Sequence, residues 1–197
     1  MKLKLAAYIA SDVKTSEDWH KKYDEVLDFY EGFAVVMLDG KCGFVNMKGE
    51  EVVPLKYDRM DHFRNGLSKV KLDNKWGFVN MKGEEVVPVK YDFIHFFYSN
   101  DISAARLNDK YGFINVKGEE IIPLKYDSVK KFHDGFAQVM IENKWGLFNE
   151  KGEEIIPLKF TEEEIIQILQ GCNLLAYKLN VSKEEALKLI LEEMDKH

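Results

Sequence analysis

The sequence is poor in cysteine and proline, and it lacks a long apolar run. Two cysteines, Cys42 and Cys172, and four prolines occur among 197 residues. Two cysteines in unrelated contexts form no disulfide framework, which favours a reducing compartment. No apolar run approaches the roughly 20 residues that span a bilayer, and the run over residues 5–10 is shorter than the core of a secretory signal. These absences predict a cytoplasmic protein with no membrane contact.

Positive charge is also low relative to negative charge, because the sequence has 28 lysine and arginine residues against 34 acidic residues, which gives a net charge of −6. A nucleic-acid-binding face usually needs a basic stripe, so nucleic acid is excluded as a partner. The sequence has no nucleophile elbow, no phosphate-binding loop and no zinc-type spacing of histidine and cysteine. We therefore expect no catalytic residues, no metal site and no cofactor.

What the sequence does contain is a four-fold internal repeat. A residue pair ending in glycine recurs at steps of 34, 35 and 34 residues, in the order Cys42-Gly43, Trp76-Gly77, Tyr111-Gly112 and Trp145-Gly146. The repeats begin at Tyr23, Tyr57, Tyr91 and Tyr126, and Phe160 stands where a fifth would begin. Periods of 20–50 residues are typical of solenoids, propellers and other arrays, in which each repeat buries its apolar face against a neighbour.

Each repeat reads as short strands joined by tight turns. Valine, isoleucine and aromatic residues dominate the strand-like runs, and turns such as Asn46-Met47-Lys48-Gly49 place glycine where a hairpin needs a positive φ. The run Trp76 to Asn80 is apolar on both faces, which predicts the inner strand of its repeat. The prolines occupy one equivalent position and are expected at a strand end or a sheet edge: Pro54, Pro88, Pro123 and Pro157.

Two of the repeats contain a Lys-Trp-Gly triplet, Lys75-Trp76-Gly77 and Lys144-Trp145-Gly146, followed by N-x-K-G-E-E and a run that ends in proline. This pattern resembles the WG (KWG) repeat family of bacterial proteins. Lys110-Tyr111-Gly112 is a mild variant, and Lys41-Cys42-Gly43 departs most. The resemblance covers residues 23–160. It implies a β-rich repeat domain that acts as an interaction module, and it implies no catalytic residue.

The two ends of the chain do not follow the repeat. Residues 1–22 are expected to supply an edge strand over residues 2–10 and a short helix capped by Ser16. Residues 161–197 carry two capping boxes, which begin at Thr161 and Ser182 and predict helices. Gly171 is expected to end the first of these helices. Covering the exposed end of the array is the plain role for this segment, and docking of a partner is the alternative.

The predicted fold is therefore mainly β, with four tandem hairpin-type repeats over residues 23–160 in an open, solenoid-like array and a C-terminal helical cap. A small closed propeller is the alternative, although its blades usually use about 40 residues or more.

The predicted function is non-catalytic binding of another protein, and the alternative is glycan binding by the repeated aromatic residues. Structural core is favoured for Trp76, Tyr111 and Trp145, because large aromatic residues dominate core burial. The leading tyrosines stand at repeat junctions, where half-exposed hydroxyl groups would be available for recognition. The third repeat has one extra residue in its first turn, where Asp101 replaces a glycine. The candidate interaction surface consists of Tyr57, Tyr91, Tyr126, Tyr98 and Asp101.

Overall fold

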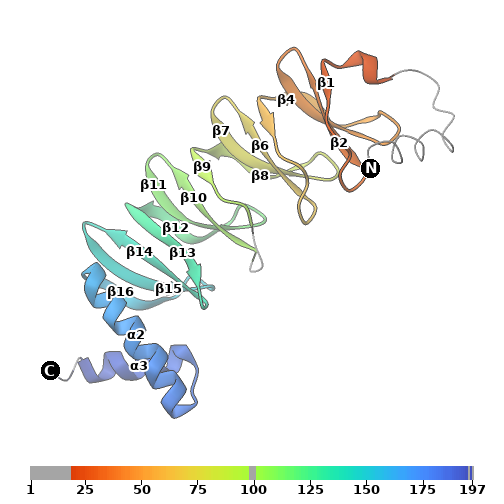
Figure 1. Ribbon diagram of the computed structural model, residues 1–197. Helices are drawn as coiled ribbons and strands as arrows, with labels where there is room; N and C mark the ends of the chain where they lie inside the picture. The colour runs from red at the N-terminus through yellow and green to blue at the C-terminus, as the bar shows by residue number, and fades with distance from the viewer. Residues whose placement is uncertain (1–18, 98–100, 195, 197) are drawn as a thin grey trace. The chain divides into compact units, whose positions relative to one another are not determined.

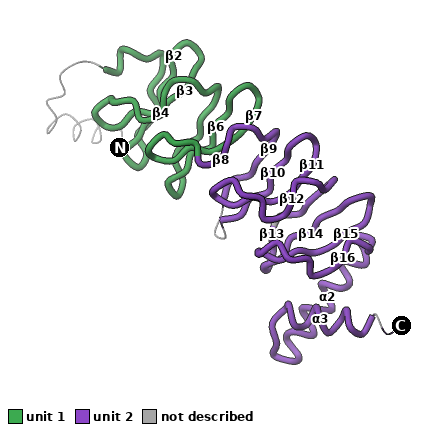
Figure 2. Tube along the Cα trace, turned by 180° about the vertical axis from the view of Figure 1, so that it is seen from behind, with its two compact units in different colours: residues 1–85 green, residues 86–197 purple. Residues whose placement is uncertain are grey.

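The structure is a computed structural model that describes residues 19–97, 101–194 and 196. The chain divides into two compact units, residues 1–85 and residues 86–197, which Figure 2 shows in separate colours. The edge strand expected over residues 2–10 and the helix cap expected at Ser16 lie outside the described residues. The first described element is a short 3₁₀ helix, η1 (Trp19–Lys22).

The described residues form four sheets of four strands, each in the order in which its strands occur along the chain (Figure 1). The first sheet contains β1 (Glu25–Val26), β2 (Phe33–Leu38), β3 (Lys41–Asn46) and β4 (Glu51–Tyr57). The second contains β5 (Arg59–Met60), β6 (Leu67–Leu72), β7 (Lys75–Asn80) and β8 (Glu85–Tyr91). The third contains β9 (Phe93–Ile94), β10 (Ile102–Leu107), β11 (Lys110–Asn115) and β12 (Glu120–Tyr126). The fourth contains β13 (Ser128–His133), β14 (Phe136–Ile141), β15 (Lys144–Asn149) and β16 (Glu154–Phe160).

Tight turns set the antiparallel register of these strands. The turn between β2 and β3 has positive φ at Asp39 (50°) and Gly40 (72°), which is the conformation that a two-residue hairpin requires. The next turn is held by Asn46, whose side-chain oxygen accepts the backbone N–H groups of Lys48 at 2.9 Å and Glu50 at 3.1 Å. Asn80, Asn115 and Asn149 make the same pair of bonds in the other repeats. The predicted turn chemistry is confirmed.

In each sheet the strand that contains the repeated proline is an edge strand, as expected, but it continues for three residues beyond the proline. In the first sheet, β4 contains Pro54 and ends at Tyr57. Its pairing with β3 is irregular on both sides of Phe44. Such a β-bulge in an edge strand tolerates Pro54, which has no backbone N–H to donate. A Cβ added to Gly43 would lie 2.6 Å from the carbonyl oxygen of Val53. The glycine beside the aromatic position therefore admits the backbone of the edge strand.

In residues 86–197, the third and fourth sheets pack face to face. Phe113, Ile122 and Tyr126 of the third sheet form one cluster with Val139 and Phe148 of the fourth. Side chains alternate between the two faces of a strand, so the fourth sheet presents a second apolar face on its other side. The carboxyl-terminal helices cover that second face.

In residues 1–85, aromatic rings join the first and second sheets. Phe44 of β3 stacks on Phe63, with ring centroids 4.3 Å apart, and Phe63 is 1% exposed. A Cβ added to Gly83 would lie against the carbonyl oxygen of Val52, which shows how closely the two sheets approach. Burying one sheet face against the next is how a repeat supplies its core.

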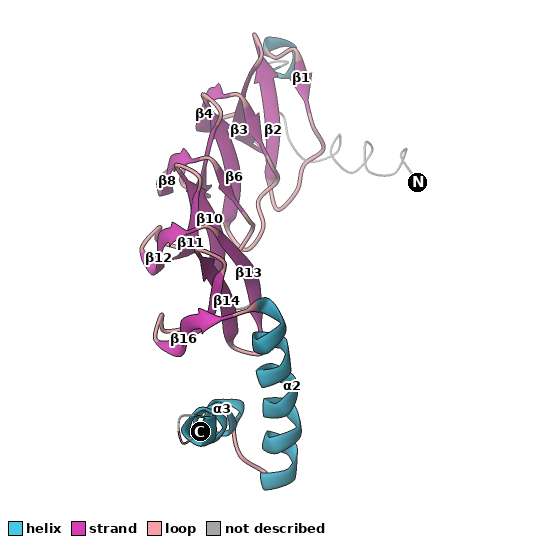
Figure 3. Ribbon diagram, turned by 90° about the vertical axis from the view of Figure 1, so that its left-hand side faces the viewer, coloured by secondary structure: helices cyan, strands magenta, loops and turns pink. Residues whose placement is uncertain are grey.

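Two helices, α2 (Glu162–Leu179) and α3 (Lys183–Met194), follow the last strand (Figure 3). Both capping boxes form, at Thr161 and at Ser182. The predicted stop at Gly171 is wrong, because α2 continues through it to Leu179 and is capped by Asn180, which has the left-handed conformation with φ 54°. A helical glycine costs only about 1 kcal/mol relative to alanine, and the apolar residues on both sides of Gly171 bury against α3 and the sheet.

The helices pack on the fourth sheet and bury its outer face. Trp145, Leu147, Ile156 and Phe160 of the sheet join one cluster with helical residues. The helical members of that cluster are Ile165, Ile168, Cys172, Ala186 and Leu187. These contacts are those of a cap. In the described part of the chain, no helix has both the length and the apolar character needed to cross a membrane.

The mainly β class, the four tandem repeats and the terminal helices are as the sequence predicted. The strand that contains Trp76 is an inner strand of its sheet, also as predicted, because β7 lies between β6 and β8.

Candidate functional site

The leading tyrosines are not surface residues, so the predicted half-exposure is wrong. Tyr57 and Tyr91 are 0% exposed and Tyr126 is 1% exposed. Each is the last residue of an edge strand, at the junction with the next repeat. The ring of Tyr126, for example, meets Phe148 of the following sheet at a centroid distance of 5.8 Å. A large apolar ring at a junction between repeats is buried by the repeat that follows.

The hydroxyl group of Tyr57 has an internal partner as well. It donates to Glu85 Oε1 at 2.9 Å, and Lys56 Nζ reaches the same oxygen at 2.9 Å while lying 4.9 Å from the centre of the tyrosine ring. Burial, and next the hydrogen bond to the Glu85 carboxylate, raise the pKa of Tyr57. Tyr57 therefore helps to hold two repeats together and leaves little exposed surface for a ligand to contact.

The irregular turn of the third repeat is only partly described. Tyr98 lies outside the described residues. Asp101 is exposed and has φ 53°, the left-handed conformation expected of it where other repeats place glycine. Because Tyr57, Tyr91 and Tyr126 are buried while Asp101 is exposed, these four residues do not form the predicted interaction surface.

The aspartate that follows each leading tyrosine has a structural task that the sequence reading missed. Asp58 Oδ2 accepts the backbone N–H of Asp73 at 2.8 Å, and Asp58 Oδ1 pairs with Lys41 at 2.6 Å. The Lys41 ammonium, and next the Asp73 amide, hold the pKa of the Asp58 carboxyl below its usual value. The carboxylate therefore fixes its own hairpin turn and also binds the preceding repeat.

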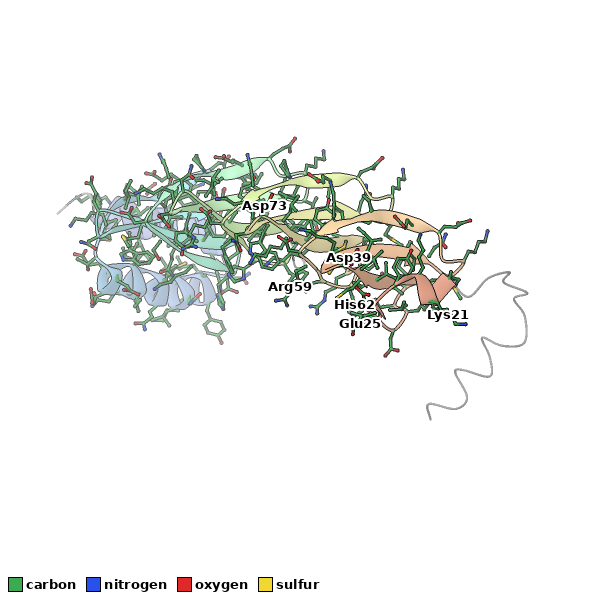
Figure 4. The ribbon with its side chains drawn as sticks, turned by 90° about the horizontal axis from the view of Figure 1, so that it is seen from above. Lys21, Glu25, Asp39, Arg59, His62 and Asp73 are labelled. Carbon is green, nitrogen blue, oxygen red and sulfur yellow. The ribbon has the colours of Figure 1, made fainter. Side chains whose placement is uncertain are left out.

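The same arrangement recurs at Asp127, which accepts the N–H of Glu142 at 2.9 Å and pairs with Lys110 at 2.5 Å. Asp39 and Asp73, which supply amides at equivalent turns of the first two repeats, are labelled in Figure 4. The lysine before the aromatic-glycine pair and the aspartate after the tyrosine are thus the two halves of one contact between repeats. Their spacing of 17 residues is the signal that the sequence offered.

Of the four positions that precede the repeated glycine, Cys42 and Trp145 are buried, whereas Trp76 and Tyr111 are partly exposed. Trp145 is 8% exposed and lies beneath the helices, and Cys42 is 6% exposed, with its Sγ 3.9 Å from the carbonyl oxygen of Asp58. Burial raises the pKa of the Cys42 thiol. Trp76 is partly exposed, but Lys69 Nζ covers its ring at 4.3 Å and Lys71 Nζ lies at 5.4 Å. A row of open tryptophan rings, which the glycan alternative requires, is not present at these positions.

One group of exposed apolar side chains lies on turns at one end of the strands in the first two sheets. Tyr30 is 52% exposed and Phe29 37% exposed in the turn before β2, while Met47 is 64% and Met81 38% exposed in the turns after β3 and β7. We call these four residues the turn-edge patch. The start of β2 pairs with the end of β3, where Phe33 lies opposite Asn46, so the turns before β2 and after β3 lie at the same end of the first sheet. Met81 follows β7, which pairs with β6 in the same register in the second sheet, where Leu67 lies opposite Asn80.

Ring contacts hold the turn-edge patch in place. Tyr30 lies 6.1 Å from the imidazole of His62, a residue labelled in Figure 4. Phe29 meets the edge of the Trp19 ring at 6.2 Å, and that tryptophan packs against Gly49 in the Met47 turn. The sequence did contain a signal for this patch, because turn positions are normally polar. Asp134 and Glu150 occupy such turns in the fourth repeat.

Among the described residues, no group of three or more histidine, cysteine, aspartate and glutamate side chains could hold a metal ion. The ion pairs of Lys41 with Asp58 and of Lys110 with Asp127 each join one repeat to the next.

Comparison with solved structures finds distant similarity to several proteins. Hsv2 from Kluyveromyces lactis aligns with 64% of this chain and 49% of its own, at 13% identity and a TM-score of 0.35. A eukaryotic initiation factor aligns with 56% of this chain and 35% of its own, at 11% identity and a TM-score of 0.36. The chain therefore spans about half the length of Hsv2 and a smaller share of the initiation factor. TM-scores this low support no argument about function. No curated protein matches the chain.

The family described as WG containing repeat matches five consecutive segments of the sequence. They are residues 20–42, 43–76, 76–111, 111–145 and 145–162. The matches follow the period of the four sheets, and the last one ends where α2 begins. The chain belongs to the WG containing repeat family.

Proposed function

We propose that the chain is a non-catalytic repeat module that binds another protein through the turn-edge patch of its first two sheets. The observation that carries the proposal is the exposure of Tyr30 and Met47, at 52% and 64%, on turns where polar residues are usual. Aromatic residues and methionine are enriched in the buried centres of protein interfaces, and methionine adapts its shape to a partner surface.

The scaffold suits this role. The patch sits on turns that side-chain and backbone hydrogen bonds fix, such as the Asn46 bonds beneath Met47. Fixed turns lose little conformational freedom on binding, and this reduces the entropic cost of association. Exposed Arg64 and Lys48 flank the patch and supply a polar rim. The net charge of −6 favours a protein partner over nucleic acid, and a cytoplasmic setting accords with the two thiols.

Quantitative crosslinking capture tests the proposal. The full chain and the variant Tyr30→Ser/Met47→Ser are used as baits in the same lysate, and the recovery of each captured protein is compared. Glu150→Ser is the matched control, because Glu150 occupies the position of Met47 in the fourth repeat and is already polar.

We expect a specific partner that the full chain and the control recover and that the double variant recovers at least about ten-fold less, as loss of a central anchor predicts. Equal recovery by the double variant would show that the turn-edge patch is not the binding surface. Capture of no specific partner by the full chain would count against the binding role itself.

A further inference from the structure

The long helix α2 carries apolar side chains on the side that faces away from its core. Ile166, Leu174 and Tyr177 are 42%, 56% and 86% exposed. An α-helix turns by about 100° per residue, which places these three positions within about 80° of one another. The buried residues Ile165 and Cys172 lie on the other side of the same helix. The three exposed residues therefore form a narrow apolar row, which we call the α2 stripe.

The other residues on this side of α2 are polar and exposed. Gln170 lies at the centre of the stripe, one turn from both Ile166 and Leu174, because residues four positions apart share a face of a helix. Glu163 lies before the stripe and Lys178 lies beside its end. Figure 3 shows α3 packed beside α2 on one side. The stripe is on a side of α2 that the described part of the chain leaves open to solvent.

The two ends of α2 carry opposite charges. Its first turn contains Glu162, Glu163 and Glu164, and Lys178 is the basic residue of its last turn. Glu162 pairs with Lys130, and Glu164 completes the capping box at the start of the helix. Within the described part of the chain, Glu163 and Lys178 form no ion pair. These two exposed charges are available to a second molecule.

The stripe and its charges are complementary to a reversed copy of themselves. Ile166 and Leu174 lie four residues to either side of Gln170, so a two-fold axis at Gln170 would bring each of them opposite the other in a second copy. Lys178 lies about 12 Å beyond Gln170 along the helix, and Glu163 lies about 10 Å before it. The same axis would therefore place each Lys178 beside Glu163 of the second copy.

This charge arrangement selects among the surfaces that could cover the stripe. Parallel pairing of two α2 helices would set Glu163 against Glu163, whereas antiparallel pairing sets it against Lys178. Antiparallel pairing also places the negative end of each helix dipole beside the positive end of the other. A lipid surface is disfavoured, because cytoplasmic leaflets are anionic and α2 has three carboxylates against one lysine.

We propose that the α2 stripe is a self-association surface, through which two copies of this chain form an antiparallel dimer with two-fold symmetry. Two-fold dimers, in which the same patch of each copy meets itself, are the most common oligomers. The inference goes beyond the proposed function, because the turn-edge patch belongs to the first two sheets and supplies none of these contacts.

The dimer should be weak. Three apolar side chains from each copy make a small contact compared with the roughly 1,200–2,000 Å² that stable complexes bury. We expect a dissociation constant on the order of 100 µM, so the chain is monomeric when dilute and dimeric when concentrated.

Sedimentation equilibrium of the full chain from about 10 µM to about 1 mM, a range that brackets this constant, measures the association. The mass should rise from that of a monomer to that of a dimer and no further. Leu174→Ser/Tyr177→Ser is expected to raise the dissociation constant at least about ten-fold, as loss of central anchors predicts. Leu189→Ser, at an exposed leucine of α3, is the control and should leave it unchanged.

Charge exchange tests the orientation of the two helices. Glu163→Lys and Lys178→Glu each replace two attractions in the antiparallel dimer with two repulsions, so each variant alone should dimerise at least about five-fold more weakly. An equimolar mixture of the two variants should associate as well as the full chain, because the mixed dimer has opposite charges at both ends.

Glu192→Lys makes the same change of charge at an exposed position of α3 and serves as the control. It should not weaken the dimer. The chain carries a net charge of −6, so a general effect of added positive charge would strengthen association of Glu163→Lys. The expected weakening has the opposite sign. Recovery in the mixture also shows that the single variants are folded.

The proposal is overturned if the full chain stays monomeric up to about 1 mM, ten times the expected dissociation constant. It is also overturned if Leu174→Ser/Tyr177→Ser dimerises as well as the full chain. Unchanged dimerisation of Glu163→Lys would indicate parallel pairing and would overturn the antiparallel arrangement. These measurements use no partner protein, so the capture experiment decides the proposed function separately.

Discussion

The hydroxyl group of Tyr57 donates to Glu85 Oε1, although the two residues lie 28 positions apart in the sequence. Tyr57 ends the edge strand of the first sheet, and Glu85 begins the edge strand of the second. The contact joins the end of one edge strand to the start of the next, so it depends on how the second repeat packs against the first. In the last repeat Phe160 takes the place of the tyrosine, and a helix follows instead of another glutamate.

Tyr57→Phe is expected to lower the free energy of unfolding by about 1 kcal/mol, because it removes one hydrogen bond to a charged group that Lys56 continues to neutralise. Urea denaturation followed by circular dichroism measures the change. Tyr30→Phe, which removes a hydroxyl from an exposed ring, is the control and should change stability by less than about 0.5 kcal/mol. An unchanged midpoint for Tyr57→Phe would mean that the bond contributes nothing to cohesion.

Acid should weaken the contacts made by Asp58 and Asp127. Their carboxyl pKa values lie below the ordinary 3.8 in the folded chain, because a lysine and a turn amide bind each carboxylate. The folded state then binds these protons less tightly than the unfolded state. The stability gained is complete above the ordinary pKa and is lost as the pH falls through the lowered folded-state pKa.

Urea midpoints measured from about pH 6 to about pH 2 should therefore fall steeply at the acid end, and Asp58→Asn should flatten that fall. Asp109→Asn, at an exposed turn position where asparagine is equally accepted, serves as the control and should keep the full slope. Identical acid slopes for Asp58→Asn and the full chain would contradict a role for the lysine–aspartate pairs.

Gly43→Ala is expected to destabilise the chain by more than about 2 kcal/mol, because a steric clash in a packed sheet cannot relax cheaply. The new Cβ would lie 2.6 Å from the carbonyl oxygen of Val53 and 3.0 Å from the amide nitrogen of Leu55. Thermal unfolding with a matched change at Gly171 distinguishes this from a general effect of alanine.

Gly171→Ala should have the opposite sign. The added methyl group would meet nothing closer than Ile190 Cδ1 at 3.7 Å, and alanine is favoured over glycine inside a helix by about 1 kcal/mol. We expect a higher melting temperature for this variant. A lower melting temperature would show that α2 bends or ends at residue 171, as the amino-acid sequence predicts.

Leu187→Ala tests the cap. Leu187 is 0% exposed in the cluster formed by the helices and the fourth sheet, so its truncation should cost about 2–5 kcal/mol. Leu174→Ala, at a helical residue that is 56% exposed, should cost less than about 0.5 kcal/mol. Hydrogen exchange should show the loss of protection concentrated in α2, α3 and β15. Equal small effects for the two variants would argue that the helices do not seal the sheet.

The repeats, their turns and the helix caps were predictable because they depend on local chemistry. Asn46 caps its own turn within four residues, and Thr161 forms its capping box within three. Such bonds need no knowledge of the rest of the chain. The error at Gly171 has the same origin, because the local preference for ending a helix at glycine is weaker than the tertiary burial of Cys172 and Ile168.

The candidate site was harder to predict, because exposure is a property of neighbours. Tyr57 and Tyr30 are the same residue type at equally plausible junctions, yet one is 0% and the other 52% exposed. The difference is that a following sheet covers Tyr57, whereas Tyr30 lies on a turn at the sheet edge. The apolar character of the Met47 and Met81 turns was visible in the sequence, but only the strand register showed that the Met47 turn lies at the same end of its sheet as Tyr30.

The period, the strand-and-turn order, the family and the helical end of this protein can be predicted from the amino-acid sequence, because each depends on residue types at fixed short spacings. Which aromatic residues are core and which are surface depends instead on the tertiary fold, as the buried Tyr57 and the exposed Tyr30 show. That division depends on which sheet face or helix covers a side chain, and contacts between residues tens of positions apart determine that.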